Sequence, residues 1–279
     1  MNTQLEKIRD VQKAAWNKSS VGWKKWDEVF MNFLQPVGDE MIKMLGLEAH
    51  HHVLDIATGT GEPGLTISSI LTKGNVTGTD ISEEMLRVAR ENAQKKGIDN
   101  FKTVSCHESA LPFADNTFDA VTCRCGLMFF PDLHLAFNEM IRVLKPGGRI
   151  CVAVWNGPEK NPWIATSMQT MITMLELKQP IPGGPGLFRC AQPGFLSKLF
   201  DECGMDNIQE KEVIGNLQCN TVDTYWTFIT ECASPLAFQA ADDELKSNIK
   251  TTILEKLSIR NPEGRISLSS NAIVISGRK

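Results

Sequence analysis

A glycine-rich turn and the acidic residue that ends the next strand are the positions best suited to chemistry. The turn, residues 59–64, reads Gly-Thr-Gly-Glu-Pro-Gly and follows a short apolar run at residues 52–57. Such a turn lets a ligand approach the backbone, and it points N–H groups at the start of a helix toward an anion. Asp80 follows at a spacing that suits a carboxylate accepting hydrogen bonds from ribose hydroxyls. The pattern predicts a nucleoside-containing ligand, although a glycine turn can also serve only to close a tight strand–helix connection.

Asp55 helps to separate the two cofactors that such a turn accepts, NAD and S-adenosylmethionine. It precedes Gly59 by four residues, which gives the pattern Asp-x-x-x-Gly-x-Gly. A carboxylate there would neutralise the ammonium of a methionine moiety, whereas it would repel a pyrophosphate. The only tyrosine, Tyr225, is followed four residues later by Ile229, so the chain has no Tyr-x-x-x-Lys pair for proton transfer. These residues favour S-adenosylmethionine, and an NAD-dependent oxidoreductase is the alternative.

Alternating strands and helices must position these side chains. Short apolar runs predict strands at residues 52–57, 75–79, 101–105, 118–123 and 149–155, and helical spacing predicts helices at residues 63–72, 82–96 and 132–145. Ser82 can cap the second of these helices, and Pro146-Gly147-Gly148 is expected to stop the third. Strands that alternate with helices in this way predict a doubly wound parallel sheet covered on both faces.

The flanking segments are interpreted as additions to this sheet. Residues 1–46 read as an N-terminal helical cover, in which Pro36 interrupts the second helix and a third short helix covers residues 37–45. Residues 47–279 read as one domain with insertions at about 157–190 and 221–263, the first of which holds a turn-rich run at 180–186. A helix at 193–203, a strand at 207–218 and a final strand at 265–276 complete the pattern. Candidate lid residues are Trp16, Trp23, Trp26, Met168, Met171, Met174, residues 183–188, Tyr225, Trp226 and Phe228.

Four motifs in order make residues 50–156 resemble a known family. They are residues 53–61, residues 78–82 with Met85, Leu111-Pro112-Phe113 before Phe118-Asp119, and residues 142–148. Together they are similar to the class I S-adenosylmethionine-dependent methyltransferases, and most similar to the branch of ubiquinone/menaquinone C-methyltransferases. The resemblance implies a Rossmann-like methyltransferase fold: a doubly wound, seven-stranded, mostly parallel α/β sheet whose terminal strand is antiparallel.

The resemblance also implies which residues bind S-adenosylmethionine. Asp55 and the glycine turn would hold the methionyl part, Asp80 the ribose, and Ile81 with Met85 the adenine. His107-Glu108 stands where the family usually has an Asp-Ala pair, so either side chain could accept from the adenine amino group. Arg124 would contact cofactor or substrate at the mouth of the site, or pair with a surface carboxylate. The full set is Asp55, Ala57, Thr58, Gly59, Thr60, Gly61, Asp80, Ile81, Met85, His107, Glu108 and Arg124.

The implied reaction is an in-line transfer of a methyl group to a small acceptor. An apolar set of insertions favours an apolar or aromatic acceptor, such as a quinol or a phenol. These acceptors require proton removal, and His134, at the start of the helix after the fourth strand, is the candidate general base. A non-catalytic cofactor-binding protein that keeps only the fold is a further alternative.

Composition excludes several other classes of protein. The net charge of −4 gives no reason to expect a nucleic acid as partner, and no apolar run approaches the ~18 residues that span a bilayer. Eight cysteines without a CxxC pair or a secretory signal indicate reduced thiols and a cytoplasmic location. Cys106, Cys123, Cys125 and the run His50-His51-His52 lack zinc-site spacing, so no metal is expected. The sequence carries no signal for an oligomeric state.

Overall fold

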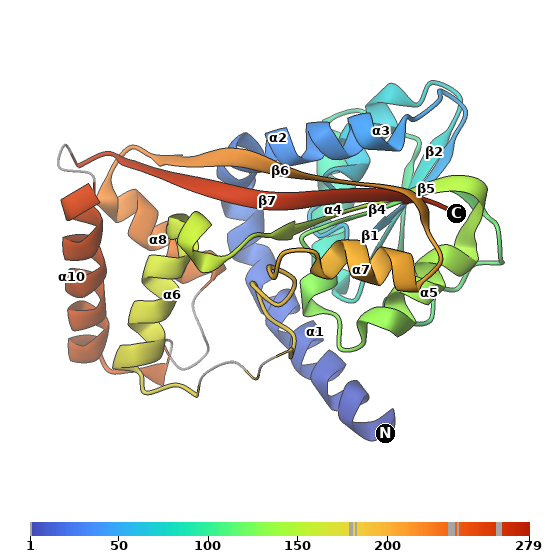
Figure 1. Cartoon of the computed structure of the whole chain (residues 1–279). Helices are drawn as coiled ribbons and strands as arrows, with labels where there is room; N and C mark the ends of the chain where they lie inside the picture. The colour runs from blue at the N-terminus through green and yellow to red at the C-terminus, as the bar shows by residue number, and fades with distance from the viewer. Residues whose placement is uncertain (1, 179–180, 182, 234–237, 239, 261–263) are drawn as a thin grey trace.

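One sheet organises the chain in the computed structural model, which describes residues 2–178, 181, 183–233, 238, 240–260 and 264–279. Among these residues, seven strands lie in the order β3-β2-β1-β4-β5-β7-β6 (Figure 1). β7 is antiparallel to both of its neighbours, and the other pairs are parallel. The predicted doubly wound, mostly parallel sheet with an antiparallel terminal strand is therefore confirmed. The strands are β1 His52–Ile56, β2 Asn75–Asp80, β3 Phe101–Ser105, β4 Phe118–Arg124, β5 Leu144–Trp155, β6 Asp206–Cys219 and β7 Ile266–Arg278.

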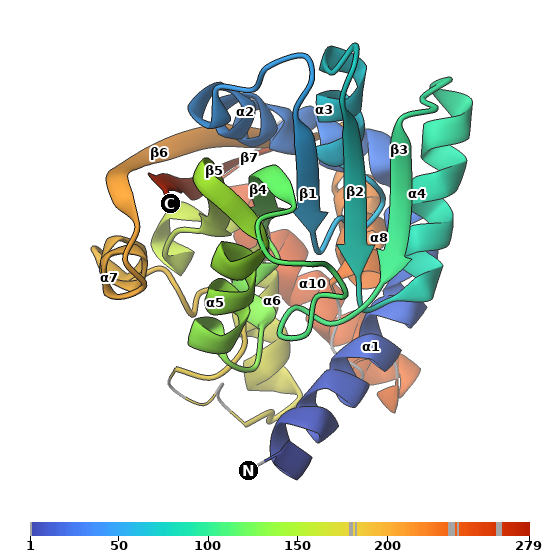
Figure 2. The ribbon, with the colours of Figure 1, turned by 90° about the vertical axis from the view of Figure 1, so that its right-hand side faces the viewer.

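Helices cover both faces of the sheet. α2 (Asp27–Leu45) and α3 (Gly64–Ile70) lie on one face, and α5 (Leu133–Val143) and α7 (Phe195–Glu202) lie on the other. α4 (Glu83–Lys95) packs beside β2 and β3 at the edge of the sheet (Figure 2). Because both faces are covered, the central strands are buried along most of their length, as expected of a parallel sheet.

α2 runs through Pro36, so the predicted break at this proline is wrong. Phe33, Leu34 and Val37 are buried on both sides of Pro36 in sequence, and they continue one apolar stripe toward β5, β6 and β7. Pro36 itself lies on the exposed side of the helix. Proline removes one backbone hydrogen bond, but water can satisfy the freed carbonyl there while the stripe holds the helix on the sheet.

The ends of α4 and α5 follow their capping signals in part. The Ser82 hydroxyl accepts from the Met85 N–H at 3.1 Å, which confirms the predicted cap of α4. α5 ends at Val143, and Pro146-Gly147-Gly148 lies within β5 instead of stopping the helix. The Thr117 N–H bonds to the Val143 carbonyl at 2.8 Å. Partners distant in sequence therefore satisfy the last carbonyls of this helix.

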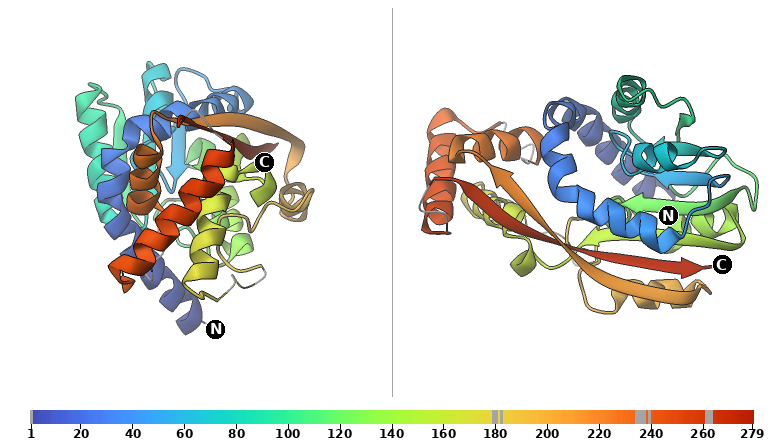
Figure 3. Two further views of the ribbon diagram at one scale, coloured as in Figure 1. Left: turned by 90° about the vertical axis from the view of Figure 1, so that its left-hand side faces the viewer. Right: turned by 90° about the horizontal axis from the view of Figure 1, so that it is seen from above.

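β6 and β7 continue together beyond the end of β5 and form a two-stranded arm. Their pairing extends to Cys219 and Ile266, whereas β5 pairs with β7 only from Ala272 onward. The arm leads to α6 (Pro162–Met174), α8 (Val222–Cys232) and α10 (Asp243–Arg260), which pack together (Figures 1 and 3). Residues 180 and 182 of the turn-rich run and residues 234–237, 239 and 261–263 of the second insertion lie outside the described residues.

α1 (Asn2–Lys25) crosses between the sheet and these outer helices (Figure 1). It contacts α4 and α8, and a Cβ at Gly22 would come within 2.5 Å of the Glu231 carbonyl oxygen. Glycine at this position therefore permits the close approach of α1 to α8. No helix in the described part of the chain has both the length and the apolar character that crossing a membrane requires.

Candidate active site

A cleft lies where the carboxyl ends of β1, β2 and β4 meet α1, and it holds about 900 Å³ of space between its walls and its open side. Open α/β sheets bind ligands at this edge of their strands. The strand ends and the loops after them contribute Ile56, Ala57, Thr58, Gly59, Thr60, Glu62, Thr79, Asp80, Ile81, Cys106, Glu108, Arg124, Cys125, Gly126, Phe129 and Phe130. Helices contribute Gln12, Trp16, Trp23, Leu34 and Met85. Most of the predicted cofactor residues are thus brought together.

Asp55 lies beneath the glycine turn and not on the wall of the cleft. Its Oδ2 atom accepts from the Thr58 hydroxyl at 2.6 Å and from the Gly64 N–H at 3.2 Å. A Cβ at Gly64 would come within 2.8 Å of the same oxygen, so glycine there lets the helix start sit on the carboxylate. Burial raises the pKa of Asp55 to about 7, against the lowering effect of these hydrogen bonds. Its Oδ1 atom is buried without a partner among the described residues, and a cationic group held at the turn would satisfy it.

Asp80 lies on the wall of the cleft at the end of β2. Its Oδ2 atom accepts from the Gly59 N–H at 3.0 Å, and its Oδ1 atom accepts from the Ser82 N–H at 2.8 Å. Each oxygen of a carboxylate can accept more than one hydrogen bond, so both can also receive a hydroxyl from the cleft. Burial raises the pKa of Asp80 to about 6, although the two backbone donors oppose this. Gly59 has φ +55°, and the space where its Cβ would stand is open.

The residues present fit S-adenosylmethionine. Asp80 offers two carboxylate oxygens at the position expected for ribose hydroxyls, and Ile81 and Met85 line the cleft beside it. The open space at Gly59 leaves room for a ligand against the backbone. The unpartnered oxygen of Asp55 lies beneath the same turn.

Glu108, and not its neighbour His107, lines the cleft. Glu108 is buried, and its Oε1 atom lies 3.3 Å from Nε of Arg9 on α1. The His107 ring turns to Ser109, with Nδ1 and Oγ 3.2 Å apart. Of the two residues that could meet an adenine amino group, the structure therefore places the carboxylate at the cleft.

α1 and the loop after β4 roof the cleft with aromatic rings. The Gln12 side chain donates to the Phe129 carbonyl at 2.5 Å, and Trp16 meets the Phe129 ring edge-on with 5.3 Å between centroids. Trp23 stacks on Phe30 of α2. Trp16 and Trp23 are among the residues predicted from the sequence, whereas Gln12, Phe129 and Phe130 are not. For the two phenylalanines, the signal in the sequence was the apolar run Leu-Met-Phe-Phe at residues 127–130, shortly after β4. By itself such a run is typical of a buried core segment, and only the position of α1 shows that it lines a cleft.

Arg124 lies at the end of β4, beside the glycine turn. It lines the cleft and also a second cavity of about 510 Å³ between α2 and the start of α3. A Cβ at Gly126 would come within 2.5 Å of the Ala57 Cβ, so the loops after β1 and β4 touch closely here. Within the described residues, no hydrogen bond or ion pair engages the Arg124 guanidinium. The predicted surface ion pair is therefore not formed.

His134, the candidate general base, and most of the candidate lid residues do not line the cleft. His134 is exposed at the start of α5, and its Nε2 atom lies 3.4 Å from Glu202. The Tyr225 hydroxyl donates to the Trp163 carbonyl at 2.7 Å, deep in the core. Of the candidate lid residues, Trp16 and Trp23 line the cleft, whereas Trp26, Met168, Met171, Met174, residues 183–188, Tyr225, Trp226 and Phe228 do not.

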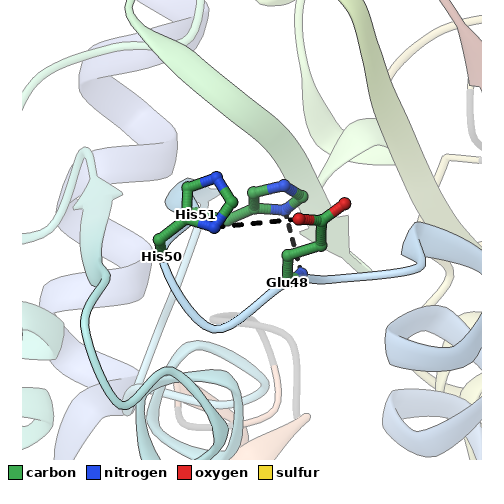
Figure 4. Close-up of side chains that lie close together, drawn as sticks. All are labelled: Glu48, His50 and His51. Carbon is green, nitrogen blue, oxygen red and sulfur yellow. Dashed lines mark hydrogen bonds and ion pairs between the residues drawn. The ribbon is translucent and has the colours of Figure 1, made fainter.

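Among the described residues, the cysteines that could suggest a metal form no group of potential metal ligands with the histidines. Cys106 and Cys125 line the cleft, and burial raises the pKa of Cys106 to about 11 and that of Cys125 to about 12, so both are thiols at neutral pH. In the described chain, the group with metal-ligand atoms within 4.8 Å of one another is Glu48, His50 and His51 (Figure 4). It lies before the amino end of β1, away from the edge that forms the cleft. Its signal in the sequence was Glu-x-His-His.

Comparisons with known proteins agree with this site. A family model described as a methyltransferase domain matches residues 47–202. The chain is 42% identical over 120 residues to the ubiquinone/menaquinone biosynthesis C-methyltransferase of a Marinomonas species, which is 42% of this chain and 48% of that protein. It is 36% identical over 125 residues to the demethylmenaquinone methyltransferase of Listeria welshimeri, covering 44% of this chain and 53% of that protein.

The chain thus spans about half the length of the curated relatives it matches. A solved structure of the YcgJ protein from Bacillus subtilis is similar over more of the chain. It is 25% identical with a TM-score of 0.56, and the match covers 87% of this chain and 97% of that one. From the matched domain, the strand order and the cleft at Asp80, we conclude that this chain belongs to the family of class I S-adenosylmethionine-dependent methyltransferases.

Proposed function

We propose that this protein methylates a small apolar or aromatic acceptor of quinol or phenol type, with S-adenosylmethionine as methyl donor. The observation that carries the proposal is the lining of one cleft, which contains two kinds of side chain. Asp80, Ile81 and Met85 suit a nucleoside. Aromatic rings and Arg124 line the same cleft, and they suit an acceptor with an apolar body and a polar group.

The residues of the cleft position the reactants and exclude water. When bound, S-adenosylmethionine supplies a methyl group whose bond to the sulfonium sulfur breaks as the acceptor's electron pair forms the new bond, which leaves the sulfur neutral. Asp80 and the turn at Gly59 hold the donor in place, and Trp16 with Phe129 closes the cleft above. Correct alignment of the two reacting atoms accounts for most of the acceleration in such a displacement.

The carboxylates of the cleft are engaged with protein donors and are not placed as free bases. Glu108 pairs with Arg9, Glu62 pairs with Lys96 and accepts from Thr66, and Asp80 accepts from two backbone N–H groups. The acceptor must therefore lose its proton in another way. A hydroxyl whose pKa is lowered by a nearby cation can give its proton to water.

Binding assays with S-adenosylhomocysteine and NAD test the proposed cofactor. We expect S-adenosylhomocysteine to raise the melting temperature and NAD to leave it unchanged, because a ligand that binds only the native state stabilises it. Asp80→Asn should weaken S-adenosylhomocysteine binding about 10- to 100-fold, since it removes the charge that receives two hydroxyls. Stabilisation by NAD alone would instead indicate an oxidoreductase.

A turnover assay tests catalysis, with S-adenosylhomocysteine release measured across quinols, phenols, thiols and amines. We expect turnover with quinols or phenols. Cofactor binding without release on any acceptor would indicate a non-catalytic binding protein. His134→Ala serves as a matched control outside the cleft, and both its turnover and its cofactor binding should equal those of the wild type. Loss of turnover with intact binding would instead support His134 as the general base.

We also propose a cytoplasmic location and no nucleic-acid partner. All eight cysteines are free, which agrees with a reducing compartment. The net charge of −4 gives no reason to expect a phosphate backbone as partner.

A further inference from the structure

We propose that Arg124 binds an ionised oxygen of the methyl acceptor, so that the site selects acceptors with a phenolate or enolate at or beside the methylated atom. This inference rests on the proposed function and assigns one residue of the cleft to the acceptor. It depends on the position of Arg124, on its lack of a partner among the described residues and on the aromatic rings that line the same cleft.

Arg124 is half-buried and has unused donors. A guanidinium is always charged at neutral pH and carries five N–H donors. Within the described residues no hydrogen bond or ion pair uses them. Leaving such a group without acceptors inside a protein is costly, and a ligand that brings an anionic oxygen recovers the cost. The guanidinium is therefore arranged for a partner that the chain itself does not supply.

The charged groups around Arg124 have other partners. Asp27 accepts from the Thr60 hydroxyl at 3.1 Å, and Asp55 accepts from Thr58 and Gly64 beneath the turn. Glu62 accepts from both the N–H and the hydroxyl of Thr66 and pairs with Lys96. Asp39 faces the second cavity from α2.

Burial also weakens the negative field at the guanidinium. It raises the pKa of Asp27 above its usual value and that of Asp55 to about 7. Near neutral pH the Asp55 carboxyl therefore carries less charge than an exposed one would. The positive charge of Arg124 is left only partly compensated.

Aromatic and apolar side chains line the same cleft as Arg124. Trp16, Trp23, Phe129 and Phe130 line it, and Leu34 lies with them. Such side chains can bind a planar ring, and an ionised oxygen on that ring can bond to the guanidinium of Arg124. The arrangement fits a phenol, a quinol or an enolised ring better than an aliphatic amine, which Arg124 would repel.

The charge of Arg124 also removes the need for a protein base. A hydroxyl bound beside it loses its proton to water more readily, because the cation stabilises the oxyanion. The electron pair of that oxygen, or of the ring carbon conjugated with it, then forms the bond to the methyl group. Where carbon is methylated, the ring proton leaves to water afterwards and aromaticity returns.

A chromogenic phenol tests the inference without turnover. In complex with S-adenosylhomocysteine, the wild-type protein should bind 4-nitrophenol as the phenolate, and an absorbance titration should show a lower pKa for bound than for free phenol. Arg124→Gln should bind the phenolate about 10-fold more weakly and show no lowered pKa. Arg124→Lys should keep part of both effects. Nitrobenzene, which has no ionisable oxygen, should bind all three proteins alike.

Two controls separate the acceptor role from other roles. S-adenosylhomocysteine affinity, measured by calorimetry, should be the same in Arg124→Gln as in the wild type, and an equal loss there would assign Arg124 to the cofactor. Arg90→Gln makes the same change in an arginine that lines neither cavity and pairs with exposed Glu83, and it should leave 4-nitrophenol binding unchanged. Should Arg124→Gln fail to fold, Arg124→Lys carries the comparison.

Failure of the inference and failure of the proposed function look different. A wild-type protein that binds S-adenosylhomocysteine and releases it on turnover, yet does not lower the pKa of bound 4-nitrophenol or does not bind it, overturns the inference alone. A wild-type protein that does not bind S-adenosylhomocysteine overturns the proposed function, and the inference with it.

Discussion

Two aspartates near the carboxyl ends of adjacent strands take opposite positions relative to the cleft. Asp55 of β1 points beneath the glycine turn and holds it through Thr58 and Gly64, whereas Asp80 of β2 faces the cleft. Burial raises the pKa of both. The first carboxyl therefore positions the turn, and the second is available to a ligand.

Asp55→Asn should change the pH dependence of stability in the protein without ligand. The pKa of Asp55 is raised from 3.8 to about 7 on folding. Between these values the native state holds a proton that the unfolded state has lost, so wild-type stability falls as pH rises, by up to about 1.4 kcal/mol per pH unit. Asparagine removes this contribution. In urea unfolding from pH 4 to pH 8, the free energy of unfolding of Asp55→Asn relative to that of the wild type should therefore increase up to about pH 7 and stay constant above it.

Asp119→Asn is a control of opposite sign. The pKa of Asp119 is lowered: burial opposes this, but the His52 N–H and Lys145 outweigh it. The stabilisation by ionised Asp119 is present above the unfolded pKa and is lost as pH falls. The free energy of unfolding of this variant should therefore decrease relative to that of the wild type as pH rises from below 4. Stability curves of Asp55→Asn and wild type that run parallel across the range would contradict the position given to Asp55.

At the scale of elements, α1 links two of the loops that line the cleft. Arg9 pairs with Glu108, and Gln12 bonds to Phe129, so one helix touches the loops after β3 and after β4. At its other end Lys25 pairs with Glu231 of α8. A ligand in the cleft is thus enclosed only while α1 is docked.

Arg9→Ala should open the first half of α1. The Arg9 and Glu108 side chains are only 13% and 6% exposed, so the change leaves a buried carboxylate without its cation. We expect faster amide exchange over the start of α1 and release of S-adenosylhomocysteine that is roughly fivefold faster or more, about 1 kcal/mol. Exchange mass spectrometry and stopped-flow release measure these effects.

Lys25→Ala is the matched control on the same helix. Lys25 and Glu231 are 54% and 36% exposed, and such surface pairs contribute about 0–1 kcal/mol. Release should change little. If both variants release the ligand at the wild-type rate, α1 is not the element that retains it.

At the scale of the whole molecule, the two helices of the N-terminal cover differ in their relation to the core. No large apolar side chain of α1 is fully buried among those described, whereas α2 packs against β5, β6 and β7. The buried side chains of α2 include Phe30, Phe33, Leu34, Val37, Met41 and Leu45. α1 therefore mainly encloses the cleft, whereas α2 also contributes buried side chains that stabilise the fold.

Two truncations test this difference, and with it the predicted boundary between residues 46 and 47. A chain that begins at residue 26 should unfold cooperatively and bind S-adenosylhomocysteine weakly. A chain that begins at residue 47 should not fold, because six buried apolar side chains at about 1.5–3 kcal/mol each equal or exceed the whole stability of a typical domain. Circular dichroism during urea unfolding measures both. A cooperative transition in the shorter chain would show residues 47–279 to be an independent domain.

Much of the sheet and of the cofactor turn could be predicted, since their signals are local. Apolar runs, a capping serine and closely spaced glycines give strands, a helix start and a tight turn within a few residues of themselves. The misplaced ends, at Pro36 and at Pro146, depend on distant partners. The stripe of α2 meets strands more than a hundred residues away, and Thr117 satisfies the end of α5.

The sequence by itself indicated the family, the doubly wound, mostly parallel sheet and the place of Asp80 at the end of the second strand, because these follow from residue type and short spacing. Tertiary structure placed Glu108 and not His107 at the cleft, left His134 exposed beside Glu202, and set Arg124 beside the turn with no hydrogen bond or ion pair among the described residues. Each of these outcomes depends on which side chain arrives from a distant element, as Arg9 does for Glu108. Packing across the fold, and not local pattern, fixes such encounters.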